Sequence, residues 1–219
     1  MGTLATLAAW NAAPWPVLRG WLGGSLAITG GLLAAVLGVA SLTVPDPTPV
    51  VLPGLHTAGT LGVVREVVLR NGLVLALHAM ACVAGYLAGS RMPREAQRYT
   101  GWLRRLHDGA PAVAMAFVAA ATVFSLVTQA LALGQAGATL AAQLGLTPAA
   151  LLALLLPHAL PELVALFLPL AAWLTASHRG RADELLAATA ATVALAAPVV
   201  VLAAVVEVYL TPRLLLHFV

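Results

Sequence analysis

The sequence predicts an all-α integral membrane protein, a polytopic bundle of about five transmembrane helices. Hydrophobic residues make up 61% of the 219-residue chain and charged residues only 9%, and the mean hydropathy is +0.96. Soluble domains carry roughly 25% charged residues, so a chain of this composition could not hydrate its own surface. Spans of about 20 residues with short connections account for nearly the whole chain, which predicts a single membrane domain over residues 1–219.

Long apolar runs mark the predicted spans. In chain order they are residues 21–44, 71–89, 111–133, 149–176 and 185–210. The first span is rich in glycine, and Gly85 and Gly89 lie four residues apart in the second. Small residues in these patterns allow helices to approach closely in lipid.

The segments between the spans predict loops and one surface helix. Residues 45–56 contain four prolines, which cannot continue a helix at that density. Residues 57–70 have an amphipathic pattern that predicts a short helix on the membrane surface. We expect residues 90–110 to form a polar loop and residues 134–148 and 177–184 to form short connections.

The arginines predict a cytoplasmic N-terminus and an external C-terminus. All 11 basic residues are arginine. This orientation leaves only Arg65, Arg70 and Arg213 outside and the other eight inside, as the positive-inside rule requires. The inside set is Arg19, Arg91, Arg94, Arg98, Arg104, Arg105, Arg179 and Arg181. We therefore expect a multi-pass protein of the cytoplasmic membrane.

Several partners and processing steps are excluded or left open at this point. No basic stripe interleaved with aromatic residues is present, which excludes a nucleic-acid partner. Cys82 is the only cysteine, so no intramolecular disulfide forms. We expect no cleaved signal peptide, because no basic residue precedes Arg19. The lipid bilayer is the expected partner, and a homo-oligomer is left open.

Four ionisable residues lie inside the predicted spans, where each costs roughly 2.5 to 3.5 kcal/mol on insertion scales. They are His78, His158, Glu162 and Glu207, and Gln129 is a weaker polar member. A rise of about 1.5 Å per residue places such residues of three different helices in the outer half of the bilayer. Together they form the candidate site.

Two interpretations of these residues remain open. His158 and Glu162 are four residues apart, so they share one helix face. One interpretation is a structural polar network without a cofactor. The other is a Zn²⁺ site made of all four residues, in which a glutamate serves as base for metal-bound water. The sequence favours the network, because metalloprotease helices carry two histidines on one face and each helix here carries one.

Short motifs resemble the stage II sporulation protein M family. Leu-Leu-Leu-Pro157-His158-Ala-Leu-Pro-Glu162-Leu is similar to its Pro-His-Gly-x-x-Glu-Leu signature, with alanine in place of the glycine. The end of the fifth span, Ala-Ala-Val-Val-Glu207-Val-Tyr-Leu-Thr-Pro212, is similar to its Ala-x-x-Glu-x-x-x-Thr-Pro ending. Asn71 matches its asparagine at the start of the second span, so the resemblance covers residues 71–212.

The resemblance implies a non-enzymatic membrane scaffold or anchor for extracytoplasmic, envelope-remodelling partners. The family's named member recruits and anchors cell-wall-degrading proteins during engulfment. Two alternatives stay open. One is an intramembrane metal-dependent hydrolase that uses the His and Glu residues. The other is a small proton-linked transporter or permease subunit, with Glu162 as the proton carrier in a fourth span interrupted by prolines.

Overall fold

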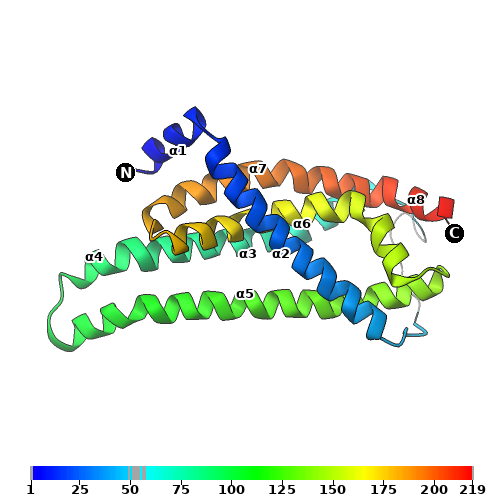
Figure 1. Ribbon diagram of the computed structural model, residues 1–219, viewed down its shortest axis with the longest axis horizontal. Helices are drawn as coiled ribbons and strands as arrows, with labels where there is room; N and C mark the ends of the chain where they lie inside the picture. Colours follow the sequence, from blue (N-terminus) through cyan, green and yellow to red (C-terminus); the bar gives the residue numbers. More distant parts are fainter. Residues whose placement is uncertain (1, 49, 51–54, 56–57, 219) are drawn as a thin grey trace.

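A computed structural model describes residues 2–48, 50, 55 and 58–218. Within this part of the chain all regular structure is helical, and five helical segments are long and apolar enough to cross a membrane. These segments are Trp15–Leu42, Leu61–Ala96, Gly101–Gln143, Pro148–His178 and Ala182–Phe218. The predicted all-α class is confirmed, with five helices of the length and apolar composition that membrane spans require. The two termini lie at opposite ends of the elongated bundle (Figure 1).

The helices follow one another in antiparallel order, with α2 crossing the bundle diagonally (Figure 1). A short α1 precedes α2, and two segments widen into π-helical turns, η1 and η3. The elements are α1 (Thr3–Ala12), α2 (Trp15–Leu42), α3 (Leu61–Tyr86), η1 (Leu87–Arg91), α4 (Met92–Ala96), α5 (Gly101–Gln143), α6 (Pro148–His178), η2 (Ala182–Glu184), α7 (Leu185–Val205), η3 (Val206–Leu210) and α8 (Thr211–Phe218).

Local chemistry sets where the long helices begin and end. The Thr147 hydroxyl accepts a hydrogen bond from the Ala150 amide at 3.2 Å and caps the start of α6. Gly145 and Gly180 follow the ends of α5 and α6 with φ of +66° and +64°. After α6, the Gly180 amide donates to Ser177 and the next amide donates to Ala176. This left-handed glycine cap satisfies carbonyls that the helix end would otherwise leave open.

The predicted loops on either side of the third span are partly wrong. Residues 101–110 and 134–143 belong to α5, a single helix of 43 residues that contains the predicted span 111–133. At its start an Arg104–Asp108 ion pair of 3.7 Å, four residues apart, supports the helix. Near its end Thr139 accepts from the Asp46 amide at 3.1 Å, and Gln143 accepts from the Val50 amide at 3.2 Å. The polar residues Thr139 and Gln143, which are typical of a loop, therefore hold the α2–α3 connection against α5.

The predicted surface helix over residues 57–70 is not a separate element. Residue 57 lies outside the described residues, and residues 61–70 form the first turns of α3, which continues without a break to Tyr86. A 3.8 Å pair between Glu66 and Arg70 spans one turn there. Asn71 and Gly72 do not end the helix, so the second span begins about ten residues earlier than its apolar pattern predicts, at Leu61.

Helix α6 lies at the centre of the core. Its middle, from Leu163 to Trp173, is almost entirely buried. Pro169 supplies no amide N–H to the helix, and carbonyls around it accept bonds from neighbouring helices. Ser25 of α2 donates to the Val164 carbonyl at 2.5 Å, and Cys82 of α3 donates to the Pro169 carbonyl at 3.1 Å. Helices α2 and α3 are thereby tied to α6 by polar as well as apolar contacts.

The small-residue pair in the second span makes the expected close helix contact. A Cβ on Gly85 would lie 2.8 Å from Leu185 Cδ1 and from Trp173 Nε1. A Cβ on Gly89 would collide with the side chain of Ala182. Only glycine allows α3 and η1 to approach α7 and η2 this closely.

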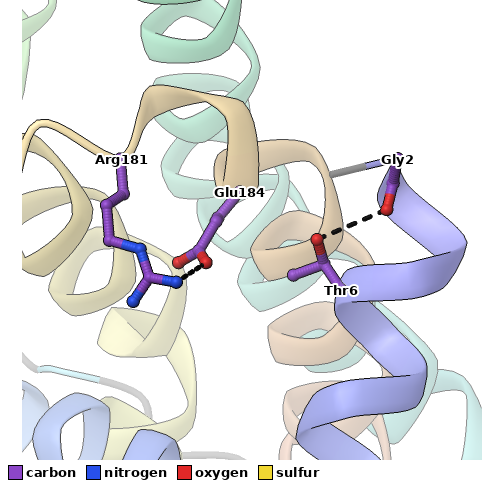
Figure 2. A network of polar contacts seen from close by, with 4 residues as sticks. All are labelled: Gly2, Thr6, Arg181 and Glu184. Carbon is purple, nitrogen blue, oxygen red and sulfur yellow. Dashed lines mark hydrogen bonds and ion pairs between the residues drawn. The ribbon is translucent and has the colours of Figure 1, made fainter.

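Helix α1 packs against the same end of the molecule as the α6–α7 turn (Figure 2). In that turn Arg181 forms an ion pair with Glu184, while the buried Thr6 of α1 donates to the Gly2 carbonyl at 3.3 Å. Trp10 of α1 meets Trp21 of α2 edge to face, with ring centroids 5.2 Å apart. These contacts close the N-terminal end of the bundle.

Candidate functional site

Two polar side chains of α6 form hydrogen bonds to other helices. Glu162 Oε1 accepts from Asn71 Nδ2 of α3 at 2.6 Å. His158 Nδ1 shares a 2.8 Å hydrogen bond with the hydroxyl of Thr211 at the start of α8. One face of α6 therefore links α3 on one side and α8 on the other, as the four-residue spacing of His158 and Glu162 predicts.

A cavity of about 340 Å³ lies beside these bonds. Asn71, His158, Glu162 and Glu207 contribute its polar lining, together with Arg70. Most of the remaining lining is aliphatic and comes from α2, α5 and α6, including Leu32, Val36, Leu140, Leu151, Leu155 and Leu163. The volume is at the lower end of the range of about 300 to 1,000 Å³ that is typical of small-molecule sites.

Glu162 is only half satisfied. Its side chain is 9% exposed, and its second carboxyl oxygen, Oε2, is buried without a hydrogen-bond donor among the described residues. Buried carboxyl oxygens are nearly always paired, because leaving one unpaired costs roughly 1 to 3 kcal/mol or more. The open acceptor is therefore a point of the cavity wall at which a ligand can donate a hydrogen bond.

Glu207 reaches the same cavity from the π-turn η3. Pro212 follows η3 by two residues, and a proline inside a helix removes one hydrogen bond and clashes with the preceding turn. The wider turn accommodates that ring, and the Thr211 hydroxyl donates to the Val206 carbonyl at 3.3 Å. Single π-turns within helices occur frequently at functional sites, and here the turn places a second carboxyl beside Glu162.

His78 does not join the other three ionisable residues. Its Nδ1 is 3.1 Å from the Leu166 carbonyl, and its ring packs against Phe167. It follows Asn71 by seven residues, about 10 Å along α3, so it lies deeper in the core than the cavity. The predicted four-residue set is therefore not assembled, and the described residues contain no group of three or more His, Cys, Asp or Glu placed to hold a metal ion.

Gln129, the weaker predicted member, also lies elsewhere. Its amide donates to Ser125 one turn earlier on α5 at 3.0 Å.

The structure adds Thr211 and Arg70 to the candidate site, and the sequence analysis does not predict either residue as part of it. Thr211 could have been found from the Thr-Pro pair that it forms with Pro212, and Arg70 from its place next to Asn71.

The residues of the sporulation M resemblance converge in three dimensions. Asn71 contacts Glu162, and His158 contacts Thr211, the neighbour of Pro212. Glu207 lines the cavity beside them, whereas Pro157 is exposed on α6.

Comparison of the chain with protein-family models, with curated proteins and with solved structures finds no match.

Proposed function

We propose that this chain is a non-enzymatic membrane scaffold of the kind that the sporulation M resemblance implies. The observation that carries the proposal is the convergence of the motif residues. Asn71 and Glu162 are 91 positions apart, and His158 and Thr211 are 53 positions apart, yet each pair is hydrogen-bonded. Motif residues that bond to one another across helices fix the arrangement of those helices, which is what a docking platform requires.

We further propose that the N-terminus is cytoplasmic and that the opposite end faces outward. The start of α2, the α4–α5 turn and the α6–α7 turn lie at one end of the bundle (Figure 1), and eight of the 11 arginines belong to these segments or to the helix turns beside them. Only Arg65, Arg70 and Arg213 flank the other end. The positive-inside rule supports this orientation.

Labelling of single cysteines tests the orientation. Cys82 is fully buried, and its replacement by alanine provides a cysteine-free background. In intact cells a membrane-impermeant maleimide is expected to label Pro47→Cys in the α2–α3 connection, because that residue is exposed. Gln97→Cys, exposed at the other end, should react only after lysis. The opposite labelling pattern would reverse the proposed orientation.

The outward end carries an exposed apolar surface suited to a protein partner. Leu42 and Val44 at the end of α2 are 89% and 87% exposed, and Leu61 at the start of α3 is 79% exposed. A photoreactive amino acid at position 44 is therefore expected to cross-link a discrete host protein in cells. Position 124, a 71% exposed phenylalanine in the middle of α5, is the matched control and should yield only lipid adducts. A lack of protein adducts at positions 42, 44 and 61 would contradict the scaffold.

A proton-linked transporter or permease subunit is the second candidate, and the cavity with the half-satisfied Glu162 favours it. Proteoliposomes with a pH gradient and an internal pH-sensitive dye separate the two functions. A transporter predicts proton entry that Glu162→Gln abolishes, although glutamine can still accept from Asn71. A scaffold predicts no proton entry and unchanged cross-links in this variant. No comparable observation favours the metal-dependent hydrolase.

A further inference from the structure

The cavity beside Glu162 has two chemically different walls. Leu32 and Val36 of α2, Leu140 of α5, and Leu151 and Leu155 of α6 form an aliphatic wall. The polar groups come from α3, α6 and η3. A molecule that fills the cavity must therefore be amphiphilic, and the volume of about 340 Å³ suits one aliphatic chain.

None of the described residues donates a hydrogen bond to the second carboxyl oxygen of Glu162 in the polar wall. The Asn71 amide already donates to Glu162 Oε1, and His158 Nδ1 is bonded to Thr211. The unpaired buried atom is Glu162 Oε2, an acceptor. A ligand that satisfies it must carry an N–H or O–H group.

The charges of the wall favour a cationic donor. Glu162 and Glu207 place two carboxyl groups on one cavity, and two such groups in apolar surroundings are stabilised by a positive charge between them. Arg70 is the cation of the lining and its charge acts on Glu207, but its side chain is 77% exposed and lies 3.8 Å from Glu66 on the surface of α3. An ammonium group supplies both the charge and the N–H donors.

We infer that this cavity binds a single aliphatic chain carrying a protonated amine, with the ammonium group donating to Glu162 and facing Glu207. A free alkylamine supplies both groups, and so does a membrane lipid that places its ethanolamine head and one of its acyl chains in the cavity. The inference goes beyond the scaffold, because it assigns a ligand to the motif residues. Its test measures ligand binding instead of cross-linking, so either proposal can fail alone.

The first experiment compares two probes on the purified full-length chain by native mass spectrometry and thermal shift. Dodecylamine and dodecyltrimethylammonium have the same chain and charge, but only dodecylamine has N–H donors. We expect one dodecylamine per chain, bound at least roughly tenfold more tightly than the trimethylated probe, as a hydrogen bond to a charged group provides. Equal binding of the two probes would overturn the inference.

Two pairs of variants locate the site. Glu162→Gln should weaken dodecylamine binding roughly tenfold or more, whereas Glu95→Gln at the far end of the bundle should not change it. Gly137→Leu should abolish binding, because Gly137 lines the cavity, a Cβ there meets no atom within 4 Å, and the rest of the leucine side chain would occupy the cavity. Gly30→Leu, equally unhindered but on an exposed face of α2, should bind normally. Full binding by Gly137→Leu would disprove the assignment even if Glu162→Gln fails to fold.

Lipid retention distinguishes the two sources of the amine. The protein is extracted from vesicles that contain equal amounts of dioleoyl phosphatidylethanolamine and dioleoyl phosphatidylcholine, and the lipids that remain bound are counted. Enrichment of the ethanolamine lipid, lost in Gly137→Leu, assigns the site to a membrane lipid. Equal retention together with tight dodecylamine binding assigns it to a free alkylamine. Equal retention without dodecylamine binding would refute both.

Discussion

Substituting alanine for Gly134 is expected to destabilise the protein by about 3 kcal/mol, the upper part of the usual range for overpacking. Gly134 lies where α5 crosses α2. A Cβ there would lie 2.6 Å from both Cβ and Cγ1 of Val39 and 3.0 Å from the Val36 carbonyl oxygen. A branched side chain and a backbone carbonyl cannot move aside without displacing α2 itself, so the two helices must separate.

Gly137→Ala is the matched control, because it makes the same chemical change one turn later on the same helix. Its new methyl group would meet no atom within 4 Å, and alanine is favoured over glycine within a helix by roughly 0.5 to 1 kcal/mol. The two variants should therefore shift the free energy of unfolding in opposite directions, measured by titration with a denaturing detergent. Equal effects would show that α2 and α5 do not meet at Gly134.

The class of the protein follows from its sequence because hydropathy is a property of composition. Too few charges are present for a soluble fold, and each long apolar run became a helix in the structure. Hydropathy does not predict where α5 begins and ends. Thr139 and Gln143 are polar and resemble loop residues, but they bond to a segment that precedes them by more than 90 positions. No local pattern records such a partner.

The sequence predicts only part of the candidate site, because spacing within one helix is a local pattern and contacts between helices are not. The spacing of His158 and Glu162 places both on one face of α6 whatever surrounds them. Estimated depth in the membrane groups His78 with them. Depth does not specify how α3 is rotated about its axis, and so it does not specify whether His78 faces the cavity. The cavity itself depends on how α2 crosses α5 and α6. Leucines that line a cavity have the same sequence signal as leucines that face lipid.

Asn71→Leu is expected to destabilise the protein by about 2 kcal/mol, because it leaves Glu162 Oε1 buried without its donor. Glu162→Leu alone would leave the Asn71 amide unpaired, whereas the double variant removes both polar partners. Interhelical hydrogen bonds in membranes average only about 0.6 kcal/mol, with a maximum near 1.7. The bond here is short and involves a carboxyl group, so we expect a coupling free energy near the upper limit, about 1.5 kcal/mol.

The double-mutant cycle is measured by the same detergent titration, with Gln129→Leu as the control. Gln129 donates to Ser125 of its own helix α5, so its loss should change stability little. Strict additivity of the Asn71 and Glu162 variants would contradict the bond. The double variant also shows what the motif is for, because replacing both partners of a buried hydrogen bond can leave stability nearly unchanged. A double variant as stable as the native chain that no longer binds dodecylamine would mean that these residues serve the ligand, since apolar side chains would then hold the helices equally well.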